Sequence, residues 1–119
     1  MPSASCHCGA ISLTVPSRPE YLVDYNCSIC RRYGALWAFY ESATVKLVGH
    51  PESTTAYIWG QRSIQTMHCK ICGCVTHWEP ITSEAGTKFG INMRNFQPAV
   101  TAGVRIRKFD GAESWAYVE

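Results

Sequence analysis

Cys69-Lys-Ile-Cys72-Gly73 is the most informative stretch of this chain, because two cysteines separated by two residues can direct both sulfur atoms at one metal ion. A second pair stands in residues 6–9, which read Cys-His-Cys-Gly, and a third in residues 27–30, which read Cys-Ser-Ile-Cys. Zinc binds about four soft ligands in a tetrahedron, and two short pairs from distant parts of a chain can supply them. The sequence therefore predicts at least one tetrahedral metal site.

Counting alone does not say which two pairs share a metal, since three pairs allow three choices. Cys8 and Cys72 are each followed directly by glycine, which readily adopts the positive φ angle that turns backbone N–H groups toward a bound sulfur. This feature favours a closed structural site built from the first and the last pair, with the ligands Cys6, Cys8, Cys69 and Cys72.

The middle pair has different neighbours. Cys27 and Cys30 are followed by Arg31 and Arg32, whose positive charge favours thiolates and attracts an anionic ligand. We therefore interpret this pair as the candidate for chemistry. The seventh cysteine, Cys74, is interpreted as a small buried residue and not as a ligand.

The cysteines also indicate the compartment. Seven cysteines in 119 residues would suggest a disulfide framework outside the cell, but an odd count in tight pairs favours metal binding in the reducing cytoplasm. The N-terminus, Met-Pro-Ser-Ala-Ser-Cys, has neither a basic region nor an apolar stretch, so we expect no secretory signal and no membrane anchor. The length favours a single domain over residues 1–119.

The charge argues against nucleic acid as a partner. The formal charge is only +2, and it falls to about zero when four thiolates hold one zinc. Hydrophobic residues make up 46% of the chain and charged residues 17%, which is ordinary for a globular protein.

Alternating hydrophobicity predicts strands along most of the chain, beginning with Ile11, Leu13 and Val15 on one face of a half-buried strand. A short helical turn is expected after Cys30 and should end at Gly34. Glycine and proline mark turns at 16–19, 49–51, 60–62, 84–86 and 110–111. The sequence thus predicts an all-β fold of antiparallel strands, at 11–15, 21–25, 36–40, 44–48, 55–59, 63–68, 75–78, 88–93 and 104–109.

The order of the motifs, Cys-x-Cys-Gly, Cys-x-x-Cys-Arg and Cys-x-x-Cys-Gly, resembles the glutathione-dependent formaldehyde-activating enzyme family, which includes centromere protein V. The resemblance runs from Cys6 to about Phe109, and includes Ala35-Leu-Trp37, the stretch 72–78 and Ile91-Asn-Met-Arg94. It implies a β-tent fold, in which a structural zinc joins the first pair to the last, through the same four ligands that the glycines favour.

The resemblance also implies a second, catalytic zinc, which the family binds through a Cys-x-Cys-x-x-Cys motif with an open position for a substrate sulfur or water. Cys27 and Cys30 match the last two cysteines of that motif, and Tyr25 stands at the first. A phenol with a pKa near ten is a poor zinc ligand at neutral pH. Of the four histidines, His77 is the best replacement by sequence, although a hydrogen-bonding role is the commoner one.

Other residues are expected beside a ligand. Arg31, Arg32 and Arg94 match carboxylates in bidentate geometry and are candidates to bind glutathione. Trp37 and Phe39 follow the second pair on one face of a strand, and we expect them near the ligand as well.

The leading hypothesis is a zinc-dependent carbon–sulfur lyase acting on the adduct of a glutathione-type thiol with a small aldehyde. The alternative is a non-catalytic zinc module, or a relative that binds a thiol without turnover, and Tyr25 favours this alternative. Thiolate ligands favour zinc over iron as the metal.

Overall fold

The computed structural model describes residues 1–60, 63–82 and 87–118, in which strands dominate and helices are short. The strands form an eight-stranded sheet of order β11-β10-β3-β4-β9-β8-β7-β6 and a three-stranded sheet of order β1-β2-β5. The expected all-β fold class is therefore confirmed. The strands are β1 (Ser3–Ser5), β2 (Ser12–Thr14), β3 (Tyr21–Tyr25), β4 (Trp37–Glu41), β5 (Lys46–Val48), β6 (Thr54–Tyr57), β7 (Ile64–Cys69), β8 (Val75–Pro80), β9 (Lys88–Asn92), β10 (Arg105–Asp110) and β11 (Ala116–Tyr117), and the helical segments are α1 (Cys30–Tyr33), η1 (Ser42–Thr44), η2 (Met93–Asn95) and α2 (Pro98–Thr101).

Each predicted strand has a counterpart whose ends differ by two residues or fewer. The strands β1 and β11 were not predicted, because Ser3–Ser5 contains no large apolar residue and β11 has only two residues. The helical turn after Cys30 is present as α1, with Gly34 at its C-cap. The turns predicted at 60–62 and 84–86 fall in part or wholly outside the described residues. In the described part of the chain, no helix is long and apolar enough to cross a membrane.

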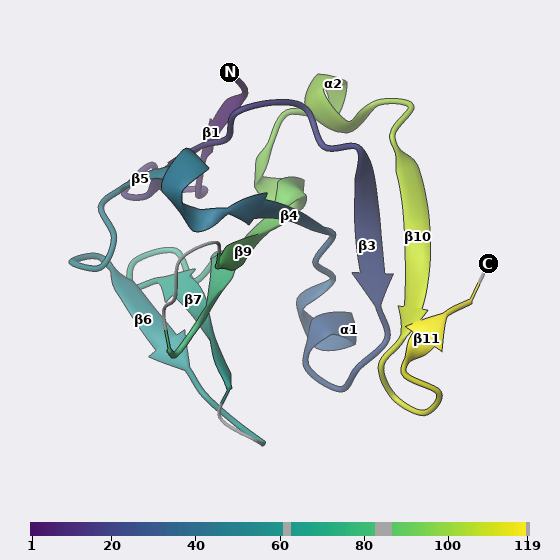
Figure 1. The fold of residues 1–119 in the computed structure, drawn as a ribbon. Helices are drawn as coiled ribbons and strands as arrows, with labels where there is room; N and C mark the ends of the chain where they lie inside the picture. Colours follow the sequence, from purple (N-terminus) through teal and green to yellow (C-terminus); the bar gives the residue numbers. More distant parts are fainter. Residues whose placement is uncertain (61–62, 83–86, 119) are drawn as a thin grey trace.

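One pairing departs from the antiparallel expectation. β3 and β10 run parallel, with Leu22 opposite Ile106, and they lie side by side in Figure 1. Turn signals predict hairpins between neighbours in sequence, whereas β3 and β10 come from opposite ends of the chain and pair through a long connection. The sheet order beyond neighbouring strands is thus set by packing and not by local sequence.

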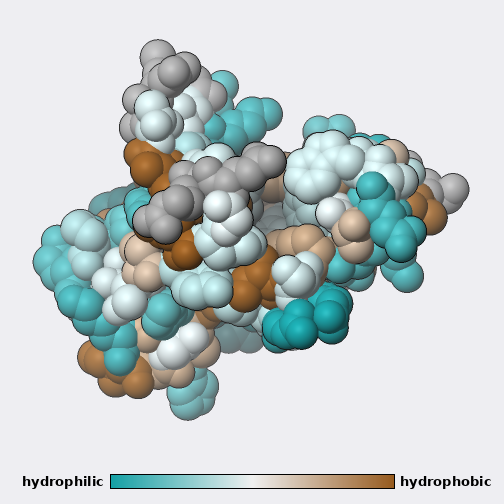
Figure 2. Space-filling model, turned by 90° about the horizontal axis from the view of Figure 1, so that it is seen from below, coloured by the Kyte–Doolittle hydropathy of each residue, from teal (hydrophilic) through white to brown (hydrophobic). Residues whose placement is uncertain are grey.

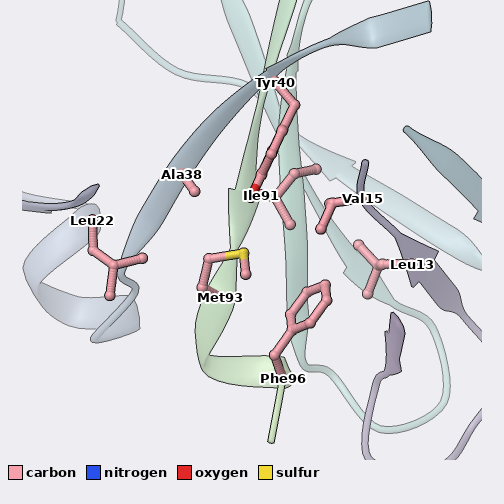
Figure 3. Packing of buried hydrophobic residues seen from close by; sticks show 8 residues of the cluster. All are labelled: Leu13, Val15, Leu22, Ala38, Tyr40, Ile91, Met93 and Phe96. Atoms are coloured by element: carbon pink, nitrogen blue, oxygen red, sulfur yellow. The ribbon is translucent and has the colours of Figure 1, made fainter. Parts of the chain in front are cut away.

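The larger hydrophobic core lies between the two sheets. Leu13 and Val15 enter it from the three-stranded sheet, and Ala38, Ile91 and Met93 enter it from β4, β9 and η2. Figure 3 shows these side chains converging from both sides. The alternating pattern that predicted β2 matches its burial, because Leu13 points into this core while Ser12 and Thr14 point away from it.

Candidate functional site

Four cysteine sulfurs meet where the two sheets join. Cys6 and Cys8 lie in the turn between β1 and β2, Cys69 is the last residue of β7, and Cys72 lies in the turn before β8. Their Sγ atoms all lie within 4.8 Å of one another, with 3.7 Å between Cys6 and Cys8 and 3.5 Å between Cys8 and Cys69. The first and the last pair are thus brought together, as the glycine argument favoured.

The backbone around these sulfurs is shaped to receive negative charge. The glycines after Cys8 and Cys72 have positive φ angles of 84° and 77°, and the residue after each glycine directs its backbone N–H at the preceding sulfur. The remaining two sulfurs have N–H donors at 3.4 Å, from Ile11 to Cys6 and from Ile71 to Cys69.

These contacts shift the pKa values of Cys72 and Cys8 in opposite directions. Backbone N–H groups of Cys74 and then Cys8 lower the pKa of Cys72 to about 5. The pKa of Cys8 is raised to about 11, because loss of water and the sulfurs of Cys69 and Cys6 outweigh the lowering effect of the Ala10 N–H. Four thiolates at this spacing need a cation between them, and four soft sulfur donors fit zinc.

The middle pair lies in a separate cavity of about 370 Å³. Cys27 precedes α1 and Cys30 is its first residue, so the tight turn into the helix places both sulfurs on the cavity wall. The rest of the wall is largely aromatic and comes from inner strands of the eight-stranded sheet and from the loops beside its outer strands: Tyr25, Trp37, Trp59, Ser63, Ile64, Thr66, Trp78 and Trp115. Figure 2 views the end of the molecule that carries α1, where apolar patches alternate with hydrophilic residues around a hollow.

Trp78 reaches this wall because its partner on β9 is a glycine. Trp78 and Gly90 are directly opposite, and a Cβ on Gly90 would collide with the indole ring of Trp78. The ring therefore lies across the β9 backbone and continues to Phe39, with 6.0 Å between ring centroids. Trp37 lines the cavity directly, whereas Phe39 reaches it only through its contact with Trp78.

The surroundings of Cys30 disfavour its thiolate form. Burial, and next the hydrogen bond with Cys27, raise the pKa of Cys30 to about 12. Burial also raises the pKa of Tyr25 to about 12, with smaller contributions from Tyr117, Cys30 and Cys27. Within the described residues, no third cysteine, histidine or carboxylate joins the pair in a cluster of ligand atoms. A bound cation, or a ligand that brings its own sulfur, is needed to complete the site.

One buried polar atom in the cavity lacks a partner. Trp37 is fully buried, and among the described residues its Nε1 has no hydrogen-bond partner. The N–H of Trp37 nevertheless acts on Cys30, since it lowers the pKa of that thiol, although less than burial and Cys27 raise it. An unused indole N–H beside a cysteine fits a site that binds an anionic sulfur.

The arginines lie outside the cavity. Arg31 is exposed on α1, and Arg32 donates to the carbonyl of Ser28 at 2.7 Å. Arg32 lines a neighbouring hollow that shares Trp59 with the cavity. Arg94 donates from Nε to the carbonyl of Gly34 at 2.7 Å, which ties η2 to the end of α1.

His77 does not complete the second site. Neighbouring residues of a strand face opposite sides, and Trp78 faces the cavity, so His77 is buried on the other side of β8. Cys74 packs against the four-sulfur cluster without belonging to it. Sequence reasoning missed Trp115 in the wall, because the loop after β10 carries no motif.

The comparisons with known proteins agree with this arrangement. The sequence model of the glutathione-dependent formaldehyde-activating enzyme family matches residues 1–108. A crystal structure of a protein from Rhodobacter sphaeroides is similar, with 27% sequence identity and a TM-score of 0.70, over 87% of this chain and 98% of that one.

Proposed function

The chain belongs to the glutathione-dependent formaldehyde-activating enzyme family, a zinc-binding family that acts on glutathione adducts, and from this premise we propose that it is a zinc-dependent carbon–sulfur lyase. Its substrate is the adduct of a glutathione-type thiol with a small aldehyde. The observation that carries the proposal is the aromatic cavity in which Cys27 and Cys30 lie beside the unpartnered N–H of Trp37.

Each zinc has its own set of sulfurs in this proposal. Cys6, Cys8, Cys69 and Cys72 hold a structural zinc, because they form a closed four-sulfur cluster. Cys27 and Cys30 would hold a second zinc, which would supply a Lewis acid that favours the thiolate form of the substrate sulfur. With only two sulfurs from the protein, that position stays open to a thiol.

The remaining residues orient the reactants. In the forward direction the thiol sulfur forms a bond to the aldehyde carbon, and the thiol proton ends on the aldehyde oxygen; the reverse reaction breaks the same bonds. Trp37 donates its N–H to the sulfur, and the aromatic wall excludes water, which strengthens that interaction. We expect no covalent bond between the substrate and the protein.

None of the described residues that line the cavity has a positively charged side chain to pair with the carboxylates of glutathione. We propose that its carboxylates reach Arg31 and Arg32, because the hollow beside Arg32 adjoins the cavity at Trp59. A contribution from Arg94 stays a prediction.

The seven cysteines, all of them among the described residues, are free of disulfides, which supports the reducing cytoplasm as the proposed location. We also propose that the chain acts as a single domain.

The proposed activity is tested by exchange NMR on a mixture of formaldehyde and glutathione, with zinc-loaded protein present. The wild type should accelerate exchange between the free thiol and its adduct, and the double variant Cys27→Ser/Cys30→Ser should return it to the uncatalysed rate. Binding of glutathione without any acceleration by the wild type would contradict the lyase proposal and favour the alternative that Tyr25 suggests, a relative that binds thiols without turnover.

The variant Trp37→Phe isolates the unpartnered N–H. Phenylalanine keeps most of the buried ring but removes the donor, so glutathione should bind about 10- to 100-fold more weakly, the loss expected for one hydrogen bond to a charged group. Calorimetric titration measures this loss, and Trp115→Phe, on the same wall but 71% exposed, is the control that should change binding far less. Equal affinity of Trp37→Phe and the wild type would show that the N–H does not contact the ligand.

A further inference from the structure

Three potential metal ligands meet on the face of the sheet opposite the cavity. His50 lies in the turn after β5, and His77 and Glu79 lie on one face of β8. Oε2 of Glu79 is 3.2 Å from Nε2 of His50 and 3.1 Å from Nε2 of His77. The two imidazole rings meet edge to face, with 4.8 Å between their centroids. Neither the cavity nor the four-sulfur cluster contains any of these side chains.

A neighbouring threonine can accept the ring hydrogen of each histidine at Nδ1. Nδ1 of His50 is 2.7 Å from Oγ1 of Thr54, and Nδ1 of His77 is 3.0 Å from Oγ1 of Thr76. Each threonine hydroxyl already donates its hydrogen to a backbone carbonyl, at Pro51 and at Met67 respectively. With the hydroxyls donating to these carbonyls, they accept from the rings, and in this tautomer the ring hydrogens lie on Nδ1 and both Nε2 atoms keep their lone pairs.

This arrangement brings three acceptors together. Two Nε2 lone pairs and one carboxylate oxygen face one another, while the other oxygen of Glu79 is held by the side-chain amide of Gln65 at 2.8 Å. Three acceptors repel one another unless a cation lies between them. Metal-binding histidines commonly donate their second ring N–H to an oxygen acceptor in this way, and ligating carboxylates are themselves hydrogen-bonded.

We propose that Nε2 of His50, Nε2 of His77 and Oε2 of Glu79 bind a divalent transition-metal ion of the zinc type. A tetrahedral zinc with bonds of about 2.0–2.1 Å separates its ligand atoms by roughly 3.3 Å, close to the two nitrogen–oxygen distances. Solvent reaches the cluster, because the side chains of His50 and Glu79 are 14% and 16% exposed. A water molecule can therefore supply the fourth ligand. The donor set of two nitrogens and one oxygen favours borderline dications over calcium or magnesium.

The competing occupant is a proton, which would turn one imidazole into an imidazolium paired with Glu79 and would need no metal. Zinc titration of the full chain that already carries one zinc in its four-sulfur cluster, followed by NMR of the histidine rings, separates the two. On adding zinc, the ring resonances of His50 and His77 should shift together, whereas those of His7, which is exposed, should not. Ring resonances that respond to pH but not to zinc would overturn the proposal.

Two variants test the same site through affinity. His50→Gln and Glu79→Gln each remove one ligand at a partly exposed position and should weaken zinc binding at this site by roughly 100-fold. His7→Gln removes an exposed histidine and is the matched control, with unchanged affinity expected. The titration is made in the Cys27→Ser/Cys30→Ser chain, so that the middle pair does not contribute. Equal zinc affinity in His50→Gln, Glu79→Gln and His7→Gln would exclude this site.

Discussion

Replacing Cys72 with serine is expected to reduce the free energy of unfolding by more than about 4 kcal/mol, enough to leave much of the chain unfolded. Cys72 belongs to the four-sulfur cluster that joins the β1–β2 turn to the β7–β8 turn, and hence one sheet to the other. A structural zinc contributes its binding free energy directly to folding, and a hydroxyl is a far weaker zinc ligand than a thiolate.

Cys74→Ser is the matched control for this experiment. Cys74 lies two residues away and packs against the same cluster, but its sulfur is not one of the four. Urea unfolding should show that Cys74→Ser lowers the free energy of unfolding by about 1 kcal/mol or less, whereas Cys72→Ser lowers it by the large amount given above. A zinc chelator should lower the free energy of unfolding of the wild type to that of Cys72→Ser. Unfolding of the two variants at the same urea concentration would contradict a structural zinc at this position.

Tyr25→Cys is expected to tighten zinc binding at the second site by roughly 100-fold, the contribution of one further ligand. Tyr25 lines the cavity together with Cys27 and Cys30, and the pKa of its phenol is raised to about 12, so at neutral pH it offers no anion to a metal. A cysteine there would restore the three-sulfur motif of the family. Zinc content should then rise by about one ion per chain above the wild-type value without added thiol.

The control is Tyr21→Cys, on the same strand. Tyr21 lies on β3 but not on the cavity wall, so a cysteine there should leave zinc binding at the pair unchanged. Elemental analysis after dialysis, together with competition against a chromophoric chelator, measures both quantities. Equal zinc content in the two variants would show that position 25 does not face the metal.

Local patterns predicted the strands well because each buried strand carries its own alternation, as β2 does with Leu13 flanked by Ser12 and Thr14. They could not predict that β3 pairs in parallel with β10, since this partner is chosen by packing between distant segments. Local sequence also predicted which cysteine pairs come together. The first and the last pair were chosen because each is followed by a glycine, and Gly9 and Gly73 do have positive φ angles.

The histidine cluster could not be predicted in the same way. His50 and His77 are far apart in sequence, and what joins them is the packing of the turn after β5 against β8. The signal in the sequence was only His77-x-Glu79, two potential ligands on one face of a strand, which is too common to indicate a site alone. Trp115 escaped prediction for the same reason, because it reaches the cavity from the far end of the chain.

The central claim is that Cys27 and Cys30 bind zinc in a cavity that a substrate thiol completes. The most direct measurement is the zinc content of the His50→Gln variant, in which the histidine cluster cannot contribute, after dialysis with and without glutathione. The account predicts an increase from about one zinc per chain to about two when glutathione is present. A zinc content that stays at about one with glutathione would contradict it.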